Sequence, residues 1–189
     1  MPGRESFPRA VPARPPDRAP PPPVKDFRRF SPAALHALFA DVYSSSDTMS
    51  EALEDKYPDA RSLAENMAAL EKLPGAVALA AEVDGKPAAY AVIRPRKQAR
   101  LRHTADLGMG VARDARGRGL GETVLRAALD RIRDESVIEI VYLMVRADNA
   151  PALRLYEKTG FETVAVLDRD TKIGDVYFAG VLMRRHMRA

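Results

Sequence analysis

A glycine-rich segment in the middle of the chain has the composition of a phosphate-binding loop. It reads Arg116-Gly117-Arg118-Gly119-Leu120-Gly121 and lies between an expected strand that ends at Val111 and an expected helix that begins at Leu120. Glycine lets the backbone turn tightly, and the first amides of a helix have no intrahelical acceptor, so several N–H groups can converge on one anion. The pattern therefore predicts a pyrophosphate site.

Two common nucleotide-binding motifs do not fit this loop. A phosphate-binding loop of the nucleotide-hydrolase type ends in Gly-Lys-Ser/Thr, which the segment lacks. A dinucleotide fingerprint needs a third glycine at the position that Glu122 occupies. The sequence of this loop therefore indicates neither a nucleotide-hydrolase nor a dinucleotide-binding motif.

A second segment further along the chain, NAPALRLYEKTGF, runs from Asn149 to Phe161. The first segment resembles the Arg/Gln-x-x-Gly-x-Gly/Ala signature of the GNAT superfamily of acyl-CoA-dependent N-acyltransferases. The second resembles that family's Asn-x-x-Ala-x-x-Leu-Tyr-x-x-x-Gly-Phe signature and matches it at every defined position. The resemblance is good over about residues 76–183 and extends to residues 24–75 only through the order of elements.

The resemblance implies an acetyl-CoA, or other acyl-CoA, site with defined contacts. The pantetheine arm would bond to Met109 and Val111, and Gly110 between them belongs to the same implied cofactor-binding stretch. Core packing is the alternative for Met109 and Val111, and both roles can hold together. The pyrophosphate would be held by the loop and the helix start, which comprise Arg116, Gly117, Arg118, Gly119, Leu120, Gly121 and Glu122.

Two side chains of the second segment complete the implied site. Tyr156 would contact the cofactor and protonate the leaving thiolate as general acid, and Asn149 would help to fix the cofactor. In a helix these residues lie about two turns apart and share one face. The alternatives are that Tyr156 packs between helix and sheet, and that Asn149 is the N-cap of its helix.

A general base is also wanted, because an alkyl amine is mostly protonated at neutral pH. Asp106, in the strand that flanks the expected cofactor site, is the best-placed carboxylate, and His103 lies just before it. A surface aspartate and a loop histidine are the alternatives.

The pattern of apolar residues predicts a mixed α/β fold of GNAT type, with a central, mostly antiparallel sheet, one splayed parallel pair and flanking helices. Strands are expected over 24–30, 76–83, 88–94, 104–111, 138–145, 161–167 and 176–183, and helices over 32–43, 62–73, 120–133 and 149–159. Ser31-Pro32 supplies an N-cap and a proline at the first helical position.

The chain divides into two parts by composition. Residues 1–23 contain nine of the fifteen prolines and almost no apolar side chains, which predicts a disordered, Pro/Arg-rich N-terminal tail. A ligand for a proline-binding module is the alternative. Residues 24–189 are expected to form one N-acetyltransferase domain.

Composition excludes several classes of function. The net charge is +4, but half of the excess lies in the tail, and aromatic residues make up 6% with no tryptophan, so no nucleic-acid partner is expected. The chain has no cysteine and no histidine pair at metal-ligand spacing, so no metal site is expected. No apolar run approaches the length of a membrane span. We therefore expect a cytoplasmic protein without a membrane partner. A homodimer is a possibility that the sequence leaves undecided.

The function expected from these observations is direct transfer of an acetyl group from acetyl-CoA to the primary amine of a small molecule, such as an amino acid or an amino-bearing antibiotic. Direct transfer is favoured because no cysteine is present to carry an acyl intermediate. The alternatives are a protein N-terminal acetyltransferase of the ribosomal-protein type and a non-catalytic acyl-CoA-binding module.

Overall fold

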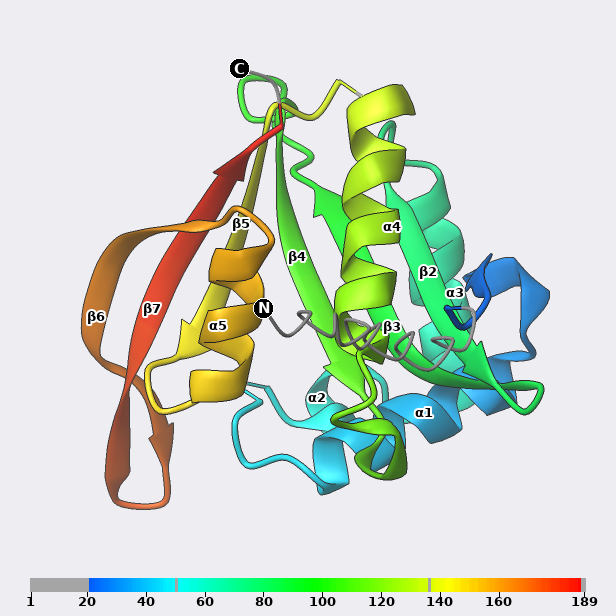
Figure 1. Cartoon of the computed structure of the whole chain (residues 1–189), viewed down its shortest axis with the longest axis horizontal. Coiled ribbons are helices and arrows are strands. Elements are labelled where there is room, and N and C mark those ends of the chain that lie inside the picture. The colour runs from blue at the N-terminus through cyan, green and yellow to red at the C-terminus, as the bar shows by residue number, and fades with distance from the viewer. Residues whose placement is uncertain (1–20, 50, 136, 188–189) are drawn as a thin grey trace, which may run out of the picture.

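The computed structural model describes residues 21–49, 51–135 and 137–187, and within them seven strands form one sheet in the order β1-β2-β3-β4-β5-β7-β6 (Figure 1). All neighbouring strands are antiparallel except β4 and β5. The strands are β1 Val24–Asp26, β2 Val77–Val83, β3 Lys86–Pro95, β4 Thr104–Val111, β5 Ile140–Arg146, β6 Glu162–Ile173 and β7 Val176–His186. The predicted fold class is confirmed.

Helices cover both faces of the sheet. They are α1 Pro32–Ser44, α2 Leu53–Lys56, α3 Ala60–Glu71, α4 Leu120–Glu135 and α5 Ala150–Lys158, with 3-10 turns at Phe27–Arg29 and Arg113–Ala115. In Figure 1, α4 and α5 lie in front of the sheet and α1 to α3 lie behind it. Among the described residues, none of the helices combines the length and apolar character that a membrane crossing requires.

The strand β3 is buried on both faces, because its alternate side chains pack into two separate cores. Ala89, Ala91 and Ile93 pack with the apolar face of α4. Tyr90 and Val92 pack with α1 and α3 on the other side. A strand that reads as an almost continuous apolar run therefore lies at the centre of the layers.

Local hydrogen bonds decide where the first elements begin and end. The Ser31 hydroxyl accepts from the amide of Ala34 at 3.2 Å, as predicted for an N-cap. The expected strand over 24–30 stops at Asp26, because the Asp26 carboxylate accepts from the Arg28 amide and turns the chain into a 3-10 helix.

Further corrections concern boundaries. The helix expected from residue 62 begins at Ala60, because Asp59 and Ser62 form a capping box. The short helix α2 was not predicted. The strands β6 and β7 run on to Ile173 and His186, beyond the expected ends at 167 and 183. Residues 1–20 of the expected tail lie outside the described residues. The Pro23 carbonyl, at the end of that expected tail, accepts from the Glu82 amide at 2.9 Å, so the sheet begins to pair there.

The parallel pair separates along its length. β4 and β5 pair only through Thr104–Asp106 and Ile140–Tyr142, whereas β5 stays paired with β7 as far as Arg146. The strands beyond Asp106 therefore diverge and leave a wedge between them, which the predicted splay anticipated.

Candidate functional site

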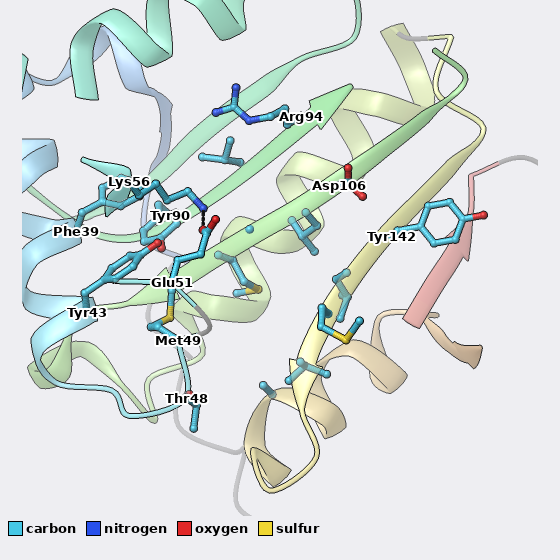
Figure 2. Close-up of a pocket in the computed structure, with 18 of the residues that line it drawn as sticks. Phe39, Tyr43, Thr48, Met49, Glu51, Lys56, Tyr90, Arg94, Asp106 and Tyr142 are labelled. Atoms are coloured by element: carbon cyan, nitrogen blue, oxygen red, sulfur yellow. Dashed lines mark hydrogen bonds and ion pairs between the residues drawn. The ribbon is translucent and has the colours of Figure 1, made fainter. Parts of the chain in front are cut away.

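A cavity of about 780 Å³ opens at the wedge between β4 and β5 (Figure 2). The strand residues at the wedge are Leu107, Gly108, Met109, Leu143, Met144 and Val145. The opposite walls come from α1, the segment that follows it, α2, α3 and α5. Elements that are far apart in the chain thus meet where β4 and β5 diverge.

The backbone of β4 is turned toward this wedge at alternate residues. Two hydrogen bonds show which residues of β4 pair with β3. The Arg96 amide donates to the Thr104 carbonyl, and the Ala112 amide donates to the Ala88 carbonyl. Residues with even numbers therefore bond to β3, and the N–H and C=O groups of Met109 and Val111 point to the side from which β5 has diverged. The N–H and C=O of Met109 and the N–H of Val111 can pair with an extended ligand, as predicted for both residues.

Gly110 contributes by its lack of a side chain. A Cβ atom there would lie 2.6 Å from Val42 and 2.7 Å from Tyr90, so only glycine allows α1 to pack this closely on β4. Gly121 allows a similar approach, because its Cβ would lie 3.2 Å from Val111. The start of α4 therefore lies directly against the end of β4.

The glycine loop is open at the positions that would face an anion. Gly117 and Gly119 have φ values of 74° and 81°, a region that favours glycine, and no atom lies within 4 Å of the Cβ that either residue lacks. Leu120, Gly121 and Glu122 begin α4, where the amides have no intrahelical acceptor. This arrangement can bind a pyrophosphate.

The side chain of Arg116 is engaged elsewhere. Its guanidinium donates to the Val111 carbonyl and to the carbonyl and hydroxyl of Ser45. The backbone amide of Arg116 is engaged as well, since it donates to the Arg113 carbonyl at 3.3 Å, so the predicted contact of Arg116 with a pyrophosphate stays a prediction. Val111 keeps its N–H to offer a pantetheine arm. Arg118 is exposed and has no ion-pair partner in the part of the chain that the structure describes.

Glu122 is held away from the anion site by two cations. Its carboxylate pairs with Lys158 at 2.6 Å and with Arg126 at 3.0 Å. Hydrogen bonds from Lys158 and Arg126 lower the pKa of Glu122. The residue joins α4 to α5, and its backbone amide is the group that can face a phosphate.

Tyr156 and Asn149 both line the cavity from α5. Tyr156 is 8% exposed, contacts Phe161 edge-on, and has a pKa that burial raises above the ordinary range, so the hydroxyl stays protonated. Asn149 is the N-cap of α5, since its Oδ1 accepts from the Ala152 amide, and its Nδ2 donates to Thr48. Their catalytic and binding roles stay predictions.

The predicted base lies where the β4–β5 pairing ends. Asp106 lines the cavity and accepts two hydrogen bonds from Arg96, at 3.1 and 2.7 Å. His103 is not among the residues that line it. Glu51, which the sequence analysis did not consider, lies across the cavity and is paired with Lys56 (Figure 2).

The remaining wall was missed entirely by the motif analysis. Phe39 stacks on Tyr90 with ring centroids 4.1 Å apart, and Tyr43 and Tyr57 extend this aromatic cluster. Arg94 donates to Asn66 at 2.6 Å. The alternation of Tyr90, Val92 and Arg94 along one strand was the available signal, because it puts all three on one face.

Comparison with known proteins gives a consistent result. The model of the Acetyltransferase (GNAT) family matches residues 37–161. The L-amino acid N-acetyltransferase AaaT of Escherichia coli (strain K12) is 32% identical over 89 residues, which cover 47% of this chain and 55% of that protein. An N-alpha-acetyltransferase of Sulfurisphaera tokodaii is 35% identical over 97 residues, covering 46% and 57%. The matched region thus spans little more than half the length of these relatives.

The fold also matches solved structures. The protein yncA of Salmonella typhimurium, solved with its cofactor acetyl-CoA, superposes with a TM-score of 0.80 over 89% of this chain and 95% of that chain. At 18% identity this likeness shows a shared fold.

Proposed function

This chain belongs to the acetyltransferase (GNAT) family, and on that premise we propose that it transfers an acetyl group from acetyl-CoA directly to the primary amine of a small molecule. The observation that carries the proposal is the opening of β4 from β5 beside Tyr156. At this point the unpaired backbone of β4 and a protonated hydroxyl line one cavity, and the glycine loop follows the end of the same strand.

In the proposed complex the pantetheine arm pairs with Met109 and with the amide of Val111. The pyrophosphate is bound by the backbone at Gly117 to Gly121, and Arg118 supplies an exposed positive charge. Asn149 holds the start of α5 at the cavity. Acetyl-CoA supplies an acetyl group that is activated as a thioester.

The proposed reaction forms one bond and breaks one. The neutral amine nitrogen attacks the thioester carbonyl carbon, and the C–N bond forms as the carbonyl oxygen becomes negative. Collapse of this adduct breaks the C–S bond, and the Tyr156 hydroxyl donates its proton to the departing sulfur. The proton that the amine loses passes to Asp106 directly or through water. The products are an N-acetyl amide and CoA.

For the acceptor we favour an amino acid, with an amino-bearing antibiotic as the other small-molecule candidate. The likeness to an L-amino acid N-acetyltransferase supports this choice. The likeness to an N-alpha-acetyltransferase keeps a peptide N-terminus as the second candidate. We place the reaction in the cytoplasm, which suits a chain without cysteine.

Release of CoA from acetyl-CoA, measured against amino acids, aminoglycosides, polyamines and N-terminal peptides, tests the proposal. We expect turnover with at least one class of small amine. A protein that binds CoA in calorimetry but releases none with any amine would be a non-catalytic acyl-CoA-binding module. Turnover confined to peptides would favour the second candidate.

A further inference from the structure

Arg94 carries a charge that the walls of the cavity do not balance. Five charged side chains of the described residues line this space. Glu51 is paired with Lys56, and Asp106 is paired with Arg96. No carboxylate of the described residues lies within ion-pair distance of Arg94, so the lining has an excess of one positive charge, which lies on its guanidinium.

The surroundings of Arg94 hold the guanidinium without neutralising it. Its Nη2 donates to the side-chain oxygen of Asn66 at 2.6 Å, in a partly buried setting. Tyr57 lines the same cavity, and Arg94 opposes the rise in the pKa of Tyr57 that burial causes. A guanidinium has five N–H donors, so several remain for a ligand.

The position of Arg94 separates it from the expected pyrophosphate site. In the β3–β4 register Arg94 lies opposite Asp106, whereas the glycine loop follows Val111. Five residues of extended strand span about 17 Å. Arg94 also lies on the same face of β3 as Tyr90, and both residues line the cavity together with Tyr156. The guanidinium thus belongs to the acceptor end of the cavity.

We propose that Arg94 binds a carboxylate of the acceptor, so that the enzyme selects amines that also carry a carboxylate group. This inference rests on the proposed function. A planar guanidinium forms two parallel hydrogen bonds with a carboxylate, and such bonds are stronger than those between neutral groups. The same charge disfavours acceptors that carry only positive groups, such as polyamines.

The first test compares amino acids with their primary amides, which keep the amine and lose the carboxylate charge. We expect the wild-type enzyme to prefer the acids. In Arg94→Gln, which keeps a donor for Asn66, KM for the preferred acid should rise about 10- to 100-fold while kcat with the amide stays near wild type. Arg94→Lys keeps the charge without the planar fork and should recover part of the lost affinity.

A second measurement does not depend on turnover. Binding of N-acetyl amino acids to the enzyme with CoA, followed by calorimetry, should weaken in Arg94→Gln by a similar factor. Arg184→Gln is the matched control, because Arg184 pairs with Glu162 on the surface outside the cavity. The affinity of Arg184→Gln for N-acetyl amino acids should equal that of the wild type. The affinity for CoA should be unchanged in every variant.

The outcomes separate this inference from the proposed function. If acids and amides react equally well and Arg94→Gln leaves both KM and product binding unchanged, the carboxylate site is wrong while the proposed acetyl transfer stands. If no amine is acetylated but N-acetyl amino acids bind through Arg94, the proposed function is wrong and the carboxylate site stands.

Discussion

The Nη2 atom of Arg116 donates a hydrogen bond of 2.6 Å to the hydroxyl of Ser45, and Nη1 donates to the Ser45 carbonyl at 3.0 Å. Ser45 is the C-cap of α1, and the same guanidinium also bonds to the carbonyl of Val111 at the end of β4. One side chain therefore joins the glycine loop, the strand that should pair with the cofactor and the helix that covers the cavity.

This connection predicts two different effects of the two loop arginines on CoA affinity. Arg116→Gln should weaken CoA binding about tenfold by loosening the loop, and the loss should not depend on salt because the bonds lie within the protein. Arg118→Gln should weaken binding in a way that diminishes at high salt, since an exposed charge is screened. Calorimetry at two salt concentrations checks both, and wild-type affinity in Arg116→Gln would show that the loop holds its shape without this link.

The open space at Gly119 predicts that added charge, more than added volume, will abolish CoA binding. Gly119→Asp puts a negative charge where the pyrophosphate should lie. Gly119→Asn is the matched control, because asparagine has nearly the same size and tolerates positive φ values without a charge. We expect the aspartate variant to bind CoA far more weakly than the asparagine variant. Equal losses in the two would point to backbone strain instead.

The buried hydroxyl of Tyr156 predicts an effect on turnover rather than on binding. Tyr156→Phe keeps the ring that packs on Phe161 and removes the proton donor. Because a thiolate is already a tolerable leaving group, kcat should fall by about 10²-fold or somewhat less, with CoA affinity unchanged. Steady-state kinetics on the best amine measures this, and a wild-type kcat would assign Tyr156 to packing alone.

The two carboxylates of the cavity can be separated by their neutral variants. If Asp106 accepts the proton of the amine, Asp106→Asn should lower kcat/KM by about 10²-fold or more, and Glu51→Gln should change it far less. Profiles of kcat/KM against pH for both variants make the comparison. The reverse order of effects would move the role of base to Glu51 on the other side of the cavity.

The ion pairs of Glu122 predict a pH-dependent contribution to stability. The fold lowers the pKa of Glu122, so its contribution is present above the ordinary value of 4.5 and is lost as the pH falls through the lower, folded value. Glu122→Gln should thus reduce the free energy of unfolding at pH 7 by about 0.5–1 kcal/mol, and the difference should shrink in acid. Denaturant unfolding at several pH values tests this. Glu157→Gln, at an exposed site on α5, should show no such trend.

The sequence by itself determined the features that depend on neighbouring residues. The cap at Ser31, the glycine loop before Leu120 and the helix that carries Tyr156 were all found where the chain alone predicted them. Caps, tight turns and apolar periodicity act within a few residues, so a local pattern is sufficient to specify them. The splay of β4 from β5 was expected through the family resemblance, not through periodicity.

Tertiary structure alone decided the acceptor half of the cavity and the partners of the charged groups. Arg94, Asn66, Tyr57 and Glu51 come from separate elements, and no spacing in the chain relates them. The pairing of Asp106 with Arg96 and the turning of the Arg116 guanidinium to Ser45 likewise depend on which strand and helix lie adjacent. These contacts join residues that only the packing of the sheet and its helices brings within bonding distance, which is why a local pattern did not contain them.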